Sequence, residues 1–388
     1  MITGLKIKGF RCFNDFSLRD LGRINLLVGL NNGGKTSVLE AIQFLTFQGN
    51  FMPLYNAMMT RGEYLWPDSR TIGPDRDLEI DICRLFHDYK IETGSKITIH
   101  GKRNGFGDEA WASIDIEAMK TPTRQMDSFG GIEAGKQRQT YLFDHNLSTS
   151  PRVMTLTWHN KPEPFKESIP LSRQGGISFK RLEKHNLSTP GSSGIAVFLS
   201  STTLPVDNIV SMFEDIVLTS EEQLVIESMR IIEPAIERIA SIGSERKIVH
   251  TGFPGIKGGL AVKCKGIERR IPIGSMGDGI WRMLSVSLAL AAAKGGILLM
   301  DDIDTGLHFT VMENMWKLIT KAAGRLDVQV FATTHNSDCW KSLAAVLRDE
   351  DAMDDSVSIQ RIEKEKNQAV AFTKDEIIIA AEREIEVR

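Results

Sequence analysis

A glycine-rich segment near the N-terminus has the residue types and spacing of a phosphate-binding loop. It runs Gly29-Leu30-Asn31-Asn32-Gly33-Gly34-Lys35-Thr36. The segment fits the pattern G-x-x-x-x-G-K-[ST] at every position. Glycine lacks a Cβ, so the backbone can direct successive N–H groups at a polyphosphate, while Lys35 reaches the β- and γ-phosphates and the Thr36 hydroxyl ligates Mg²⁺. The predicted nucleotide contacts are Asn31, Asn32, Gly33, Gly34, Lys35, Thr36 and Ser37.

A second chemical signal is a pair of carboxylates at the end of an apolar segment. The run from Gly296 to Met300 leads directly into Asp301 and Asp302. Two adjacent carboxylates in apolar surroundings repel each other and lose hydration unless a cation or hydrogen-bond donors compensate. This is the form of a Walker B element, in which the first acid holds Mg²⁺ and the second polarises the attacking water. We therefore predict that Asp301 is a metal ligand and that Asp302 is catalytic.

Two further segments gain meaning from these motifs. The strand predicted over Val328–Thr333 is followed by His335, and in a parallel sheet its carboxyl end would lie level with Asp301. A lone histidine is usually structural, but this placement favours a catalytic role at the γ-phosphate. Ser275 and Gly277 lie in a small-residue turn ahead of a long apolar helix, where free N–H groups attract anions. Many helices begin with such residues, so this second signal is weak alone.

The elements around the phosphate loop are those that its function requires. Ile24–Val28 has the composition of a buried strand, and apolar residues recur at helical spacing from Val38 to Leu45. Upstream, Ile2–Gly9 alternates as a strand and leads through Arg11 to a predicted polar turn at Asn14 and Asp15. Arg11 could fold over bound phosphates, although a surface arginine is as good an interpretation from these residues alone.

The intervening chain carries weaker signals. Residues 50–75 have the composition of an irregular excursion, and Leu78–Phe86 and Lys96–His100 are typical of strands. From about residue 101 to 194 the sequence is polar, with short alternations such as Val153–Trp158, which indicates a β-rich insertion.

A helical segment and a basic strand follow. Ser220-Glu221-Glu222-Gln223 has the form of a capping box, and Pro234 must kink or break the helix that it opens. Leu260–Lys265 alternates as a strand. It belongs to a basic cluster of Lys263, Lys265, Arg269 and Arg270. An exposed strand face is a better interpretation of this cluster than a nucleic-acid patch.

Composition sets broad limits. The chain has 388 residues, 41% hydrophobic and 25% charged, and a net charge of −3, so any DNA binding would need a local patch. Its four cysteines and eight histidines show no disulfide or zinc spacing, which suits a reducing cytoplasm. The apolar run Leu284–Met300 is interrupted by Lys294, so no membrane segment or membrane partner is predicted.

The order of these motifs resembles that of ABC-type ATPases of the RecF, SMC and OLD kind. The correspondence covers residues 1–48 and 271–340, and it adds a signature at Ser275 and Gly277 and a D-loop over residues 304–308. The opening GFRCF resembles that group's first strand, whose arginine contacts nucleotide, so the resemblance implies that Arg11 and Asp304 contact the nucleotide. It also implies an α/β P-loop NTPase fold, with a mixed and parallel sheet flanked by helices and a β-rich and helical insertion.

The resemblance implies ATP and Mg²⁺ as ligands and a head-to-tail sandwich. In it, Ser275 and Gly277 of one subunit complete the phosphate loop of another, giving a homodimer or higher oligomer. Asp302 stands where the family has a glutamate, so slow hydrolysis is expected. OLD nucleases continue into a TOPRIM domain, for which the residues after His335 are too few. We therefore expect a switch that controls a separate effector, such as a nuclease or toxin in phage defence. The alternatives are a RecF-like DNA-binding repair or clamp protein and a scaffold that binds ATP without hydrolysis.

The predicted organisation has four parts. An N-terminal ATPase lobe with the phosphate loop covers residues 1–100, and the polar β-rich insertion covers 101–205. A helical segment and the C-terminal ATPase lobe follow over 206–345, and a tail occupies 346–388.

Overall fold

The strand before the phosphate loop, β3 (Ile24–Val28), is buried at all five positions in the computed structural model of this chain. The structure describes residues 1–65, 78–103, 109–119, 152–159, 164–184, 194–201, 204–242, 259–349 and 357–388. The bounds of β3 are those predicted from its apolar run, which Gly29 ends.

Six strands form the sheet that contains β3, in the order β10-β14-β15-β3-β16-β17. The others are β10 (Ala196–Leu199), β14 (Ile297–Met300), β15 (Gln329–Thr333), β16 (Val357–Arg361) and β17 (Val370–Phe372). Neighbouring strands run parallel except for β16 and β17. The carboxyl ends of β3, β14 and β15 therefore meet at one edge, which confirms the predicted alignment of the two apolar strands.

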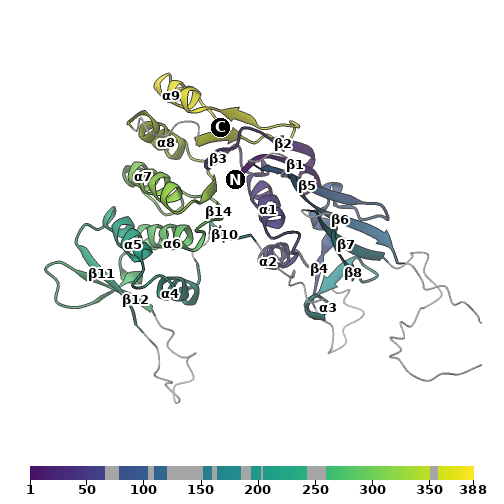
Figure 1. Ribbon diagram of the computed structural model, residues 1–388, viewed down its shortest axis with the longest axis horizontal. Helices are drawn as coiled ribbons and strands as arrows, with labels where there is room; N and C mark the ends of the chain where they lie inside the picture. Colours follow the sequence, from purple (N-terminus) through teal and green to yellow (C-terminus); the bar gives the residue numbers. More distant parts are fainter. Residues whose placement is uncertain are drawn as a thin grey trace, which may run out of the picture.

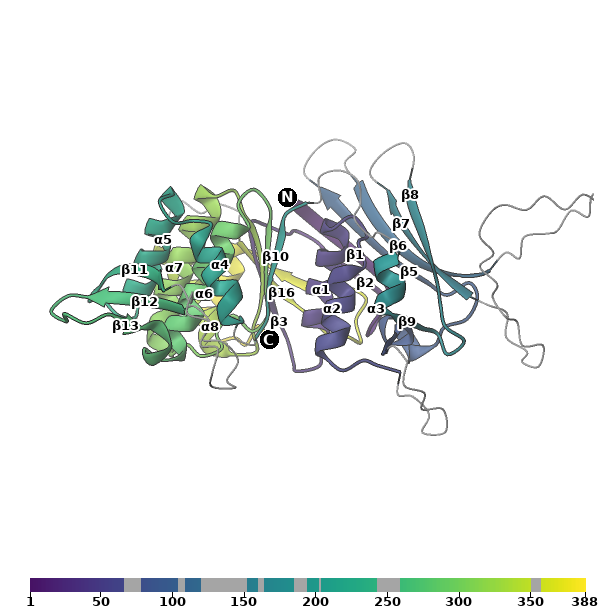
Figure 2. The ribbon, with the colours of Figure 1, turned by 90° about the horizontal axis from the view of Figure 1, so that it is seen from below.

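A second sheet is antiparallel, in the order β2-β1-β5-β6-β7-β8. Its strands are β1 (Ile2–Phe10), β2 (Phe13–Leu18), β5 (Lys96–Arg103), β6 (Glu109–Ala118), β7 (Arg152–His159) and β8 (Phe165–Pro170). Helix α1 (Lys35–Thr46) lies between the two sheets (Figure 2), and its apolar residues share one core with both of them.

Four helices cover the opposite face of the parallel sheet (Figure 1). They are α6 (Asp278–Ala292), α7 (Phe309–Arg325), α8 (Ser337–Asp349) and α9 (Lys374–Glu382). Alternate residues of β14 enter different cores, since Leu298 packs with these helices and Leu299 packs with α1. A sheet buried on both faces explains why its strands are continuous apolar runs.

A third core packs on α6 and forms the end of the molecule remote from the antiparallel sheet (Figure 2). It contains α4 (Val206–Glu214), α5 (Ser220–Arg230), β11 (Ile236–Ile242), β12 (Gly259–Cys264) and β13 (Ile271–Pro272). The remaining elements are α2 (Met52–Thr60), β4 (Glu79–Asp81), β9 (Gly176–Ser178), α3 (Phe179–Lys184) and 3₁₀ turns at Ile82–Leu85, His87–Tyr89 and Ile273–Ser275. Within the described ranges, no helix has the length and apolar character needed to cross a bilayer.

The N-terminal half corrects two local predictions. The stretch 50–75 is not irregular throughout, because α2 forms over Met52–Thr60 with Pro53 in its first turn, where proline is tolerated; Pro67 and Pro74 lie outside the described residues. The turn between β1 and β2 falls at Arg11, which has φ of 54°, and not at Asn14 and Asp15, which are part of β2.

The segment around α5 differs from two further local predictions. Its N-cap is Thr219, whose hydroxyl accepts from the Glu221 N–H at 3.3 Å, so Ser220 is already helical. The helix ends before Pro234, as predicted, but the chain after it forms strand β11.

The first predicted domain boundary falls within a strand, and the predicted parts share sheets with one another. The boundary between residues 100 and 101 lies inside β5, and β6, β7 and β8 of the predicted insertion extend the same antiparallel sheet. Strand β10, also assigned to the insertion, lies in the parallel sheet. The predicted tail supplies β16 directly beside β3, and thus forms part of the sheet that carries the phosphate loop.

Candidate functional site

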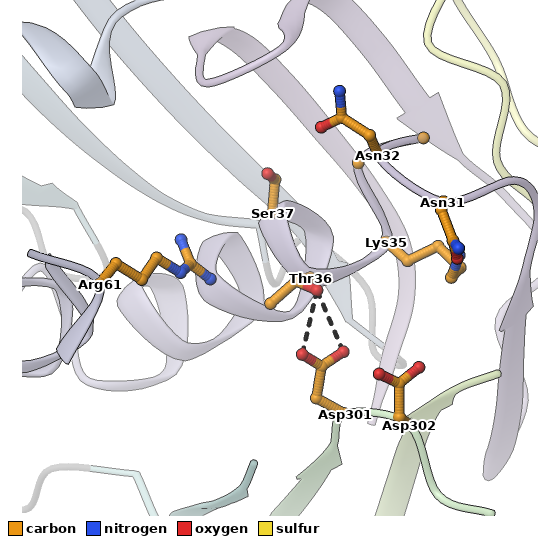
Figure 3. A pocket seen from close by; sticks show the side chains of 10 residues that line it. Asn31, Asn32, Lys35, Thr36, Ser37, Arg61, Asp301 and Asp302 are labelled. Carbon is orange, nitrogen blue, oxygen red and sulfur yellow. Dashed lines mark hydrogen bonds between the residues drawn. The ribbon is translucent and has the colours of Figure 1, made fainter. Parts of the chain in front are cut away.

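A pocket of about 410 Å³ lies at the carboxyl edge of the parallel sheet. It is lined by Asn31, Asn32, Gly33, Gly34, Lys35, Thr36, Ser37, Arg61, Asp301 and Asp302. Figure 3 shows the Walker B acids facing the start of α1 across this space. The structure thus brings together the two motifs, which lie far apart in the sequence.

Close packing fixes the shape of the phosphate loop. Gly34, directly before α1, has φ of 98°, and a Cβ there would lie 2.5 Å from Phe13 Cζ and 2.6 Å from Cys12 Sγ. A Cβ on Gly29 would collide with the carbonyl of Ile362. Only glycine suits position 34, because a side chain there would collide with Phe13 and Cys12 and because other residues rarely adopt this positive φ. The turn that precedes β2 therefore supports the loop from one side and the end of β16 supports it from the other.

Lys35 is a buried cation at the centre of this loop. Its Nζ donates to the carbonyl oxygens of Gly29 at 2.8 Å and Leu30 at 3.0 Å. Burial lowers the pKa of Lys35, while the negative charges of Asp302 and Asp301 oppose that shift. An anion entering the pocket would meet a positive charge that is poorly hydrated, and such a charge binds phosphate more strongly than one in water.

The predicted metal ligands lie in direct contact. Thr36 Oγ1 donates to the Asp301 carboxylate, at 3.1 Å from Oδ1 and 3.0 Å from Oδ2 (Figure 3). Thr333, at the end of β15, donates to Asp301 Oδ1 at 2.7 Å and fixes the carboxylate from behind. The described residues contain no group of three or more His, Cys, Asp or Glu that could hold a metal alone. Two oxygen ligands fit Mg²⁺, which commonly takes one or two protein oxygens and completes its shell with phosphate and water.

The predicted catalytic pair is also assembled. His335 Nδ1 lies 3.3 Å from Asp302 Oδ1, and the Asp302 N–H donates to Thr333 Oγ1 at 2.8 Å. Asp302 has φ of 44°, a left-handed conformation that aspartate tolerates better than most residues. Asp304 is nine-tenths buried and accepts from Thr334 Oγ1 at 2.7 Å. In this single subunit, therefore, Asp304 is bonded to the segment after β15 and is not among the residues that line the pocket.

Arg11 and Arg61 hold positions that differ from the sequence expectation. Arg11 is largely buried and pairs with Glu40 at 3.1 Å and Glu63 at 2.7 Å, and it does not line the pocket. Arg61 does line the pocket and pairs with Glu40 at 2.6 Å. Glu40 on α1 is 1% exposed and thus holds both arginines. Sequence reasoning missed Arg61 because no motif surrounds it and its partner is far away in the chain.

We expect Arg61→Ala to weaken ATP binding by about tenfold, since a charge-assisted hydrogen bond contributes about 1.5–3 kcal/mol. Isothermal calorimetry would measure this against Arg348→Ala, an exposed arginine on α8 that lies outside the pocket lining. Unchanged affinity in Arg61→Ala would show that Arg61 serves only the ion pair with Glu40.

The predicted signature turn lies elsewhere in the same subunit. Ser275 ends a 3₁₀ turn, and Gly277, with φ of 90°, precedes the first residue of α6. A Cβ on Gly277 would meet nothing within 4 Å. Neither residue is among those that line the pocket, so the turn does not complete the phosphate site of its own chain.

Comparisons with known proteins agree with this geometry. Residues 1–169 match the family model described as AAA ATPase domain, and residues 265–338 match the one described as AAA domain, putative AbiEii toxin, Type IV TA system. A Helicobacter pylori protein named ATP/GTP phosphatase is 24% identical over 372 residues, which is 90% of each chain. The DNA replication and repair protein RecF of Pseudomonas savastanoi pv. phaseolicola is 26% identical over 184 residues, 45% of this chain and 46% of RecF.

Solved structures of similar extent include an SMC head bound to the C-terminal winged-helix domain of ScpA, with TM-score 0.46, 13% identity and coverage of 96% of this chain and 97% of the other. The recombination mediator RecF has TM-score 0.38 and 12% identity. The fold assignment here rests on strand order and motif geometry. A phosphate loop after β3 and paired acids after the parallel strand β14 give the chain the fold of an ABC-type P-loop ATPase, and its sequence matches two ATPase family models and is similar to RecF over 184 residues.

Proposed function

We propose that this protein is an ATP-driven switch in which two copies close head to tail over ATP. The observation that carries the proposal is the separation of the two phosphate-binding elements: Ser275 and Gly277 line no part of their own chain's pocket. Among the described residues, the pocket is bounded by the phosphate loop, Ser37, Arg61 and the Walker B acids. A second copy can supply the N–H groups of its signature turn to the exposed side of the nucleotide. ATP would then stabilise the dimer.

The chain's own residues have distinct roles in this cycle. Lys35 and the loop N–H groups bind the β- and γ-phosphates, and Thr36 and Asp301 hold Mg²⁺, which neutralises phosphate charge when bound. Asp302 orients the attacking water. His335, whose Nδ1 lies 3.3 Å from Asp302 Oδ1, stabilises the γ-phosphate. Asp302 is one methylene shorter than glutamate, so its reach toward the water is smaller by roughly 1.5 Å. We infer slow turnover, which suits a switch that must hold one state.

The cellular output would be control of a separate effector, such as a nuclease or toxin in phage defence. One of the two matching family models is described in terms of a toxin system, and this supports the hypothesis that the protein controls an effector. The test is to isolate the protein from its native host in ATP and in ADP and to identify what co-purifies. A partner retained in only one nucleotide state would support a switch, whereas an identical set of proteins in both states would contradict it.

A RecF-like role on DNA is the second candidate, because the basic cluster is exposed. Lys265, Arg269 and Arg270 project from the end of β12 and the segment after it. ATP-induced duplex binding that weakens steeply with salt and is lost in the double variant Arg269→Ala, Arg270→Ala would favour this role over the effector switch.

Substitution of the signature serine tests the sandwich. Ser275→Arg places a bulky cation where the partner's nucleotide would bind, and we expect it to abolish the ATP-dependent rise in mass while leaving ATP affinity of the monomer within about threefold of wild type. Light scattering with and without ATP provides the measurement. Gln174→Arg, at an exposed position of the turn between β8 and β9, is the control. If the mass does not depend on nucleotide, ATP hydrolysis is measured in a mixture of Lys35→Ala and Ser275→Arg subunits. A mixture without activity contradicts the sandwich.

A further inference from the structure

One buried arginine connects the signature helix to the acidic loop after β14. Arg282, on the second turn of α6, is 6% exposed. Its guanidinium donates to four main-chain carbonyl oxygens: Ser200 at 2.9 Å, Asp301 at 3.0 Å, Asp302 at 2.7 Å and Ile303 at 3.3 Å. The first of these follows β10 and the other three follow β14, so the arginine joins two neighbouring strand ends to α6.

The free-energy cost of burying the charge of Arg282 argues against a role in which this side chain only fills space. Burial lowers the pKa of Arg282, and the charges of Asp304, Asp302 and Asp301 only partly oppose that shift. No salt bridge to a carboxylate is found for it among the described residues. A buried charge is expensive, and an apolar side chain of similar volume would fill the same space at lower cost. The planar fork of five donors, however, is suited to hold several carbonyls in fixed directions.

The held carbonyls determine the conformation of the catalytic loop. Three consecutive carbonyls, from Asp301 to Ile303, converge on one side chain, and the residue between them, Asp302, is the one in the left-handed conformation. The Asp302 carbonyl also accepts from the Thr305 N–H at 3.1 Å, at the start of the D-loop. Without the guanidinium, the carbonyls of Asp301 and Ile303 would lose this donor and that of Asp302 would keep only the Thr305 N–H, so the turn could relax. The side chain of Asp302 would then change direction.

We propose that Arg282 is a positioning residue that sets the Asp302 carboxylate and links its position to the signature turn at the start of the same helix. The role of Arg282 toward Asp302 of its own chain rests only on the contacts described above. The link to a second subunit rests on the proposed ATP sandwich: when a partner's nucleotide docks at Ser275 and Gly277, movement of α6 is carried through Arg282 to its own Walker B acids. Each subunit would thereby sense occupancy of the neighbouring site.

The test separates binding from chemistry in Arg282→Met and Arg282→Lys. Arg282 is not among the residues that line the pocket, so we expect ATP affinity within about threefold of wild type in both variants. Single-turnover hydrolysis should fall about 100-fold in Arg282→Met, since displacement of a catalytic group by about 1 Å has this effect. Lysine retains the charge but offers fewer directed donors, so Arg282→Lys should show an intermediate rate.

Another arginine that donates to main-chain carbonyls provides a control. Arg230, on α5, also donates to two main-chain carbonyls, those of Ile236 and Glu237, but these belong to β11. Arg230→Met should leave both affinity and rate unchanged. The proposal is overturned if Arg282→Met hydrolyses ATP at the wild-type rate, or if affinity and rate fall together and lysine gives no rescue. If Arg282→Met does not fold, Arg282→Lys is used alone. A hydrolysis rate below wild type at unchanged ATP affinity then supports the proposal, and a wild-type rate overturns it.

Mixed subunits test whether Arg282 acts on the Walker B acids of its own chain. In a mixture of Lys35→Ala and Ser275→Arg chains, the working site combines the phosphate loop and Walker B acids of the second chain with the signature of the first. Arg282→Met should abolish activity when placed in the Ser275→Arg chain and have little effect in the Lys35→Ala chain. The reverse pattern would overturn the proposal. If these chains fail to complement with Arg282 intact, the sandwich itself is refuted, and the single-turnover rates still decide the role of Arg282.

Discussion

Lys35→Ala should weaken ATP binding by about 100-fold or more, the largest binding effect we expect from any single substitution. Lys35 is the only side-chain cation within the phosphate loop, and its charge-assisted bonds to phosphate each contribute about 1.5–3 kcal/mol. Its Nζ already lies between the carbonyls of Gly29 and Leu30, so little ordering is needed when ATP binds. Isothermal calorimetry with Mg²⁺ and ATP provides the measurement.

The control for this variant is Lys294→Ala, which removes an exposed lysine paired with Glu221 at 2.7 Å, outside the pocket lining. It should bind ATP as wild type does. Equal affinity of Lys35→Ala and wild type would refute the phosphate-loop assignment. Omission of Mg²⁺ should weaken wild-type binding as well, because Thr36 and Asp301 would lose the cation that joins them to the phosphates.

Asp302→Asn should reduce single-turnover phosphate release by about 100-fold or more while ATP affinity is retained. Asparagine keeps the size of the side chain and tolerates the left-handed conformation at φ of 44°, so the loop should keep its shape and lose only the negative charge that orients water. Asp302→Glu should speed hydrolysis if the reach of the carboxylate limits the rate, and slow it if the loop has moved forward to compensate. Asp301→Ala should differ from both by weakening Mg²⁺ binding.

Asp327→Asn is the matched control, because Asp327 is also an aspartate with positive φ, 51°, but is exposed and pairs with Arg23 at 2.9 Å after α7. Its turnover should equal that of wild type. If Asp302→Asn also hydrolyses ATP at the wild-type rate, Asp302 is not the catalytic carboxylate, and the role passes to Asp304 or to His335 with a bound water.

The predictions that the structure confirms depend on local pattern. The strand, loop and helix around Lys35 follow from apolar spacing and glycine, and the parallel alignment of β14 with β15 follows from the two continuous apolar runs. What could not be predicted depends on contacts between distant residues. Arg61 reaches the pocket because buried Glu40 holds it. Arg282 is a single basic residue in a long apolar helix, and only the structure shows the four carbonyls around it.

The turn misplaced at Asn14 has a similar cause. Polar residues suggest a turn, but here the two polar residues lie between Phe13 and Phe16 on a strand, and the ladder with β1 overrides their preference. The actual turn contains Arg11, whose buried partners offset its unfavourable backbone conformation. Ion pairs formed across 29 or 52 residues of chain leave no periodic signal.

The position of β3 between β15 and β16 has a consequence for how the protein is made. Both strands that flank the nucleotide-binding strand are synthesised more than three hundred residues after it, as the register partners Ile24 with Val330 and Ile24 with Val357 show. The ATP site cannot be completed during early translation, because the strands on both sides of β3 are made only when synthesis has passed residue 361. Long-range parallel pairing of this kind is slow and exposes nascent chains to aggregation. Nucleotide binding is thus a property that the growing chain acquires only after β16 has been made.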